Sequence, residues 1–85
     1  MYSWEFTAEA LKDFNKLTPE TQKRIVKKLD YFVASGKPLK FAESLINYEI
    51  GQYRFRVRDY RVIFDIEDQT IVVLALGHRK DIYKG

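Results

Sequence analysis

The sequence predicts a single α+β domain in which a helical hairpin packs on one face of a mainly antiparallel sheet. Three observations predict it: a short alternating aromatic segment at 2–6, two amphipathic helical segments between residues 8 and 35, and three β-rich segments after Gly51. The order is strand, two helices and three strands, with no linker, repeat or low-complexity stretch. This order predicts one domain spanning residues 1–85.

The N-terminal elements carry clear start and stop signals. "YSWEF" (2–6) is short and alternating, which predicts an opening strand. Thr7 is placed to cap a helix through "AEALKDFNKL", whose apolar residues fall near one face. Thr18 as a cap with Pro19 at the first helical position predicts a second helix, which Gly36 ends.

The C-terminal half predicts an antiparallel meander. "QYRFRV", "YRVIFDI" and "TIVVLAL" are β-rich and separated by short polar breaks at 58–59 and 67–69. The last segment is apolar on both faces, which predicts a place in the centre of the sheet. The preceding segment, 37–51, fits neither a helical nor a strand period, and we expect a connecting loop with at most a helical turn.

Composition narrows the class of protein. The net charge of +3 and the pI near 9.2 favour a polyanionic partner. Without cysteine, a disulfide framework and thiolate metal sites are excluded, and one histidine cannot make a protein metal site, so neither a metal nor another cofactor is expected. The sequence shows neither a signal peptide nor a membrane span, and we expect a soluble cytoplasmic protein.

Residues 53–61, "YRFRVRDYR", predict a basic face on the sheet. A loop at 58–59 pairs Arg56 with Arg61 and places both on one face with Arg54 and Ile63. Like charges opposite each other destabilise a sheet by some tenths of a kcal/mol, unless an anion such as phosphate lies between them. A solvated face without a ligand is the alternative. Arg58, in the turn, is assigned to solvent or to general attraction of a polyanion.

The tail "GHRKDIY" (77–83) adds polar residues at the end of the last strand. His78, Arg79 and Tyr83 are expected near one end of the sheet. Lys80 and Lys84 add positive charge there and are expected to contact a polyanion such as RNA. Structural roles remain open for His78 and Tyr83. Together with an arginine cluster, these residue types supply the base, the acid and the cations that metal-free RNA cleavage requires.

Two long stretches resemble a known family: "ALKDFNKLTPETQKRIVKKLDYF" and "GQYRFRVRDYRVIFDIEDQTIVVLALGHRKDIY" are similar to the RelE/ParE superfamily of bacterial and archaeal toxins, and most closely to its RelE branch. The most specific pieces are the "YRxRVxDYRVIF" hairpin and the "GHRKDIY" ending. The resemblance implies a type II toxin that enters the ribosomal A site and cuts messenger RNA by 2′-OH attack without a metal. It also implies a protein antitoxin that wraps and blocks the toxin.

The resemblance implies a role for individual residues. Arg54 and Arg56 fall on the basic strand positions, Arg61 on the residue that stabilises the transition state, and Arg79 on the arginine after the last strand. Tyr83 falls on the tyrosine that stacks on a base, although the spacing from Arg79 is shorter than in longer relatives.

One position departs from the best-known members. They carry a lysine, proposed as the general base, where this chain has Arg56. Arginine stays protonated at ordinary pH and is a poor base, so the identity of the base stays open. His78 is the residue best suited to proton transfer near neutral pH.

Two alternatives remain beside the ribonuclease. ParE-type relatives share the fold and act on DNA gyrase without cutting RNA. A weakly active member would act mainly by binding its antitoxin. The combination of proton-transfer groups with arginines favours the nuclease.

Overall fold

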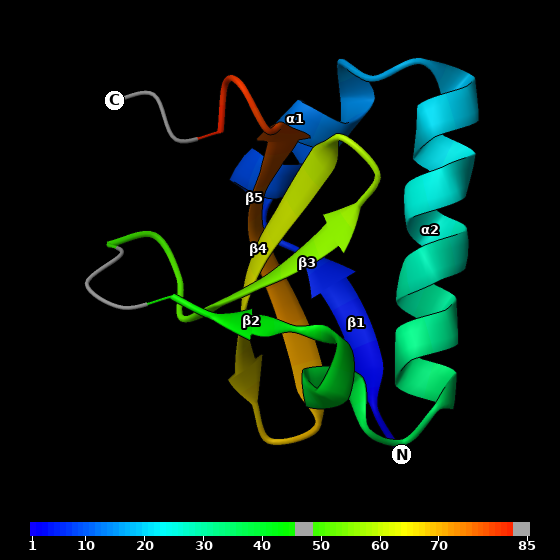
Figure 1. The fold of residues 1–85 in the computed structure, drawn as a ribbon, viewed down its shortest axis with the longest axis vertical. Helices are drawn as coiled ribbons and strands as arrows, with labels where there is room; N and C mark the ends of the chain where they lie inside the picture. The colour runs from blue at the N-terminus through cyan, green and yellow to red at the C-terminus, as the bar shows by residue number, and fades with distance from the viewer. Residues whose placement is uncertain (46–48, 83–85) are drawn as a thin grey trace.

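The computed structural model describes residues 1–45 and 49–82. Two α-helices and a five-stranded sheet account for most of this part of the chain (Figure 1). In chain order the elements are β1 (Ser3–Phe6), α1 (Ala8–Asn15), α2 (Pro19–Ala34), the 3₁₀ helix η1 (Pro38–Phe41), β2 (Glu43–Ser44), β3 (Tyr53–Val57), β4 (Tyr60–Glu67) and β5 (Thr70–His78). This confirms the predicted α+β class.

Local signals explain where the helices begin. The hydroxyl of Thr7 accepts a hydrogen bond from the backbone N–H of Ala10 at 3.1 Å, and the hydroxyl of Thr18 accepts one from Thr21 at 3.3 Å. Pro19 is the first residue of α2, where its missing N–H costs nothing. After α2, Gly36 adopts φ +75°, a conformation that glycine reaches without strain. Neither helix of the described residues has the length and apolar character that a membrane span requires.

The strand order in the sheet is β1-β5-β4-β3-β2. β1 runs parallel to β5, and the other neighbours are antiparallel. The predicted register is confirmed, because Arg56 pairs with Arg61 and Val57 with Tyr60. β5 is an interior strand, as its apolar sequence indicates, but β4 holds the central place.

The segment 37–51 was predicted to be a connecting loop with a helical turn; η1 is that turn, but the prediction missed a short strand. Residues 38–41 form η1, and Glu43 and Ser44 form β2, a fifth strand at the edge of the sheet. β2 pairs with the start of β3, with Glu43 opposite Arg54. A strand of two residues has no periodicity to detect, and only its pairing with β3 defines it.

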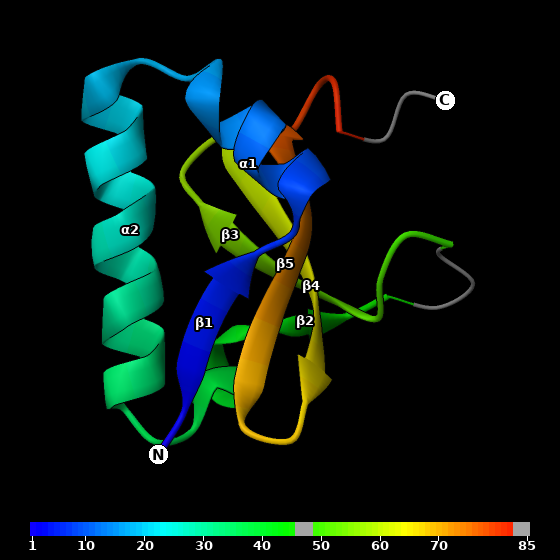
Figure 2. The same ribbon diagram turned by 180° about the vertical axis from the view of Figure 1, so that it is seen from behind.

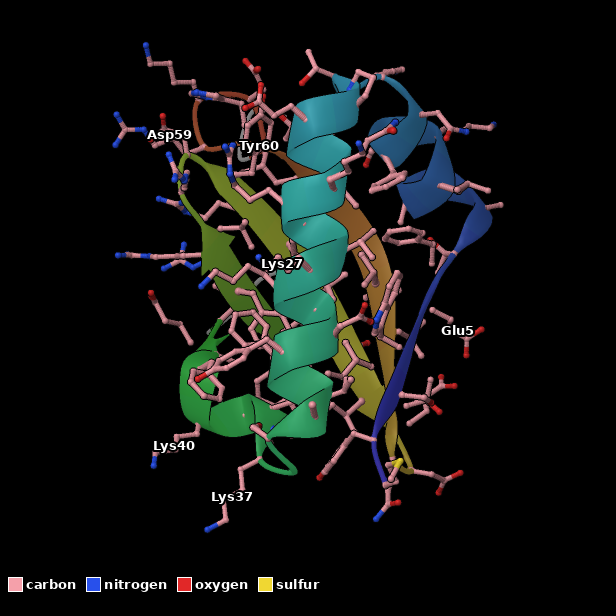
Figure 3. All side chains as sticks on the ribbon, turned by 90° about the vertical axis from the view of Figure 1, so that its right-hand side faces the viewer. Glu5, Lys27, Lys37, Lys40, Asp59 and Tyr60 are labelled. Atoms are coloured by element: carbon pink, nitrogen blue, oxygen red, sulfur yellow. The ribbon has the colours of Figure 1, made fainter. Side chains whose placement is uncertain are left out.

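The core lies between the helices and the sheet. Ile25, Leu29 and Phe32 of α2 are buried against apolar residues of β3, β4 and β5. Phe55 stacks between Phe32 and Phe64, with ring centroids 4.3 and 4.2 Å away. Figure 3 looks onto α2 with the sheet behind it, and Figure 2, the reverse of the view in Figure 1, shows α1 over the end of β5. Aromatic packing therefore joins helix and sheet, as the composition suggested.

The opposite, outer face of the sheet is only partly solvated. Ile63 points to this face and is fully buried. Gly51 covers it so closely that an added Cβ would lie 2.8 Å from the Cγ2 of Ile63 and 3.0 Å from the Cδ1 of Leu74. The absence of a side chain at Gly51 therefore allows the chain to cross the sheet there.

A bulge in β5 decides which face its last residues occupy. Ile63 pairs with Ala75 and Phe64 with Val73, so Leu74 is an extra residue in β5. Beyond the bulge the alternation changes face: Gly77 pairs with Arg61, and His78 pairs with Tyr60.

Candidate nucleic-acid interface

The centre of the candidate site is the pair of arginines opposite each other on the outer face. Arg56 of β3 and Arg61 of β4 are direct neighbours across the strands. The side chain of Arg56 is 59% exposed. Gly77 lies beside Arg61 on β5, so no side chain covers Arg61 from that strand. The predicted arginines therefore share this face, but only Arg56 is well exposed: Arg61 is half-buried and the side chain of Arg54 is 18% exposed.

An acidic residue that the sequence did not single out lies among these arginines. The Oε1 of Glu43 is 2.7 Å from the Nε of Arg56, and its Oε2 accepts a hydrogen bond from the Nη2 of Arg54. The hydrogen bond from Arg54 is the largest effect and lowers the pKa of the Glu43 carboxyl below its usual range. Burial opposes it as the next largest effect, and the positive charges of Arg54, Arg56 and Arg61 lower the pKa further. Glu43 is therefore an anion at neutral pH.

Glu43 answers in part the question that the sequence raised about neighbouring arginines, because its ion pairs are with Arg54 and Arg56 and not with Arg61. An anion does lie next to the Arg54 and Arg56 side chains, and it belongs to the chain itself. The need for an anion was visible in the sequence, but its source was not, because Glu43 lies in the segment whose structure was not predicted.

Arg61 and Arg79 meet at the turn between β3 and β4. The Nη1 of Arg61 donates hydrogen bonds to the carbonyls of Arg58 at 2.8 Å and Tyr60 at 3.0 Å. The backbone N–H of Arg79 donates to the carbonyl of Asp59 at 2.7 Å, and its Nε lies 3.7 Å from the Oδ1 of that residue. The turn therefore gathers both arginines at one end of the sheet.

His78 lies at the same end of the sheet but faces the other way. It contacts Tyr60, whose ring centroid is 5.5 Å away in an edge-to-face arrangement, on the side of the core. The Nδ1 of His78 accepts a hydrogen bond from the backbone N–H of Lys80 at 3.1 Å, so the neutral ring carries its proton on Nε2. The structure brings His78 next to the turn, not onto the face of Arg56.

Of the remaining predicted residues, the structure describes Lys80 and Arg58. Lys80 is exposed in the turn after β5. The predictions for Tyr83 and Lys84 lie outside the described residues. Arg58 adopts φ 55°, an uncommon conformation for a residue with a side chain, and its own side chain lines a groove.

This groove lies between α2 and the β3–β4 turn and was not predicted. It has a volume of about 450 Å³, with Val57 and Tyr31 among its walls and basic side chains from α2 and the turn, namely Lys23, Arg24, Lys27, Lys28 and Arg58. Figure 3 labels Lys27 on α2, together with Asp59 of the turn and Tyr60 at the start of β4. Both faces of the β3–β4 hairpin therefore carry cations.

Comparison with known proteins places the chain in a family. The chain is 32% identical to "Toxin RelG" of Mycobacterium tuberculosis, over 98% of this chain and 97% of that protein. The crystal structure of the toxin–antitoxin complex RelBE2 from the same organism matches with a TM-score of 0.78 and 30% identity, covering 92% of this chain and 98% of that chain.

Two further solved structures agree in fold. An archaeal RelE–RelB complex from Pyrococcus horikoshii OT3 matches with a TM-score of 0.71 and 26% identity, covering 94% of this chain and 97% of that one. The intact RelBE toxin–antitoxin complex of E. coli matches with a TM-score of 0.71 at 23% identity, covering 92% of this chain and 96% of that one, which supports the fold.

Residues 4–83 match the family described as the ParE toxin of the type II toxin–antitoxin system parDE. The chain therefore belongs to the RelE/ParE superfamily and is a type II toxin.

Proposed function

We propose that this toxin is a ribosome-dependent endoribonuclease that cleaves messenger RNA in the A site by metal-independent attack of the ribose 2′-OH. The observation that carries the proposal is the pairing of the exposed Arg56 with the half-buried Arg61, with Arg79 joined to the same turn. Guanidinium groups bind phosphate oxygens through paired N–H donors, and they stabilise the charge that develops on the phosphorane.

The reaction itself needs two proton transfers. The 2′-OH loses a proton, its oxygen bonds to phosphorus, the bond from phosphorus to the 5′-oxygen breaks, and that oxygen gains a proton. The products are a 2′,3′-cyclic phosphate and a 5′-OH. Arg56, Arg61 and Arg79 would serve as phosphate and transition-state ligands, while Arg58 and Lys80 would extend contact along the RNA. Arg54, which is 18% exposed and bound to Glu43, would add positive charge to the RNA-binding face.

His78 is proposed for proton transfer as an acid or a base. Because it lies opposite Tyr60 at the end of β5, the proposal places the scissile phosphate at the end of the sheet that carries the 58–59 turn. There, RNA can reach Arg61 from the outer face and the imidazole from the other. Base stacking would be the role of Tyr83.

The partners follow from the same family. RelBE2 of M. tuberculosis and RelBE of E. coli were crystallised as toxin–antitoxin complexes, and the P. horikoshii protein was crystallised as a RelE–RelB complex. We propose that a cognate antitoxin likewise binds and blocks this chain, and that the ribosome and messenger RNA are its targets.

A different function has one observation in its favour. The matching family is described by ParE of parDE, and ParE-type toxins act on DNA gyrase without cutting RNA. A weakly active member that acts mainly through its antitoxin is the third possibility. The arginine pair favours the nuclease, because a gyrase-binding surface requires no transition-state ligands.

One experiment separates these functions. The protein is induced in cells, the 5′ ends of messenger RNA are mapped, and DNA supercoiling and DNA breaks are measured in parallel. We expect cuts in phase with codons and unchanged supercoiling. Intact transcripts with gyrase-linked breaks would support the ParE-like function, and neither effect would support the weakly active member.

A further inference from the structure

We propose that Glu43 is an internal counterion that restricts the arginine face to polymeric RNA. This rests on the proposed function and concerns the selectivity of the same site. The carboxylate lies 2.7 Å from the Nε of Arg56 and also contacts the Nη2 of Arg54. Its two oxygens pair with guanidinium donors as phosphate oxygens do. Glu43 therefore holds the position on Arg56 that a phosphate would take.

The exposed fractions of the side chains indicate which of the two Glu43 contacts can exchange with a ligand. The side chain of Arg54 is only 18% exposed, whereas those of Glu43 and Arg56 are 43% and 59% exposed. A solvated ion pair is weak, because water and salt screen it. The Arg56 contact can therefore exchange for a phosphate while Glu43 stays bound to Arg54.

The need to displace Glu43 from Arg56 lowers the affinity for small anions more than the affinity for RNA. An anion that belongs to the same chain is present at a high effective concentration, so a single phosphate must displace it and is also repelled by it. A phosphodiester chain reaches Arg56, Arg61 and the arginines at the turn at once, and the additional contacts outweigh the lost one. Glu43 thus lowers affinity for every anion but disfavours mononucleotides and inorganic phosphate most.

The test compares Glu43→Gln with Glu67→Gln. Both variants lose one negative charge, but Glu67 is exposed at the far end of β4, where it pairs with Thr70. Binding of a 2′-O-methylated oligouridine of about 12 nucleotides, which cannot be cleaved, is measured by fluorescence anisotropy over a range of salt concentrations. Inorganic phosphate is titrated in parallel by NMR.

Glu43→Gln should bind the RNA about three to ten times more tightly than Glu67→Gln at low salt. The slope of log K against log salt should steepen by about 0.7, the value for one more phosphate neutralised on a single strand. Inorganic phosphate should shift the arginine resonances saturably only in Glu43→Gln.

Equal or weaker RNA binding by Glu43→Gln, or phosphate binding by the wild type as tight as by this variant, would overturn the inference. Thermal unfolding verifies that the variant is folded, and Glu43→Ala must give the same direction. Ribosome-dependent cleavage is assayed separately: if it is absent while Glu43→Gln binds RNA more tightly, the nuclease proposal fails and the counterion remains.

Discussion

Arg61 differs from Arg56 in what holds its side chain. The guanidinium of Arg61 donates to two backbone carbonyls of the adjacent turn, at 2.8 and 3.0 Å. Arg56 contacts a carboxylate that can exchange with solvent or ligand. In the proposed nuclease, this backbone anchoring would fix Arg61 before RNA binds, which is the preorganisation that electrostatic stabilisation of a transition state requires. We therefore expect Arg61 to contribute more than Arg56 to catalysis, and Arg56 to contribute more than Arg61 to binding.

Arg61→Ala should relieve growth arrest, because removal of one preorganised donor typically costs a factor of about 10² to 10³ in rate. Arg61→Lys should retain only part of the activity, since an ammonium lacks the planar fork that reaches carbonyl and phosphate together. The measurement is growth after induction combined with mapping of messenger RNA 5′ ends.

Lys12→Ala, an exposed residue of α1, is the control and should stay fully toxic. Circular dichroism shows whether each variant is folded. A fully toxic Arg61→Ala that cuts transcripts at the wild-type rate would exclude the role assigned to Arg61.

At the scale of elements, the sequence predicted what local signals determine. Thr18 and Pro19 start α2, and the two-residue break at 58–59 sets the register of Arg56 and Arg61. It failed where pairing or packing between distant segments decides. β2 exists only through its pairing with β3, and so the contact of Glu43 with the arginines could not be foreseen.

The bulge at Leu74 is the second such case. One extra residue in a strand moves every later side chain to the opposite face. His78 therefore lies with Tyr60 on the side of the core, and Gly77 lies beside Arg61. No feature of "TIVVLALGH" distinguishes an extra residue from regular alternation, because its apolar residues fit either face.

Gly51→Ala should destabilise the protein by about 1–3 kcal/mol, because the added methyl group would overpack the outer face against Ile63 and Leu74. Chemical denaturation monitored by tryptophan fluorescence measures the free energy of unfolding. Gly77→Ala is the matched control, since its Cβ would lie 3.6 Å from the Cδ1 of Ile82, an ordinary contact. Equal losses in the two variants would contradict this account of Gly51.

At the scale of the whole molecule, the β3–β4 hairpin has cations on both sides. Arg54, Arg56 and Arg61 lie on the outer face, and the α2 groove with Arg58 lies on the other. The net charge of +3 conceals this arrangement, because the acidic residues offset the total. A small net charge is therefore compatible with strong local attraction of RNA.

The loss of thermal stability at acidic pH should depend on Glu43. Its pKa is lowered by Arg54 and the neighbouring arginines, so it stabilises the fold above the ordinary value of 4.5, and this contribution is lost as the pH falls through the lowered pKa. Thermal unfolding of the wild type and Glu43→Gln should differ most near neutral pH. The two midpoints should converge as the pH falls below the lowered pKa of Glu43, where both side chains are uncharged. A difference that is constant over this range would contradict the assignment.

The parallel pairing of β1 with β5 has a consequence for synthesis of the protein. Ser3 pairs with Thr70, so the first strand to leave a ribosome has no place in the sheet until the last strand has been made. The helical hairpin, built from local contacts, can form early, but the sheet must close late. Arg61 and Arg79 also need β5 in place to meet at the turn. A nascent chain therefore has no assembled arginine site until β5 has been synthesised and has joined the sheet.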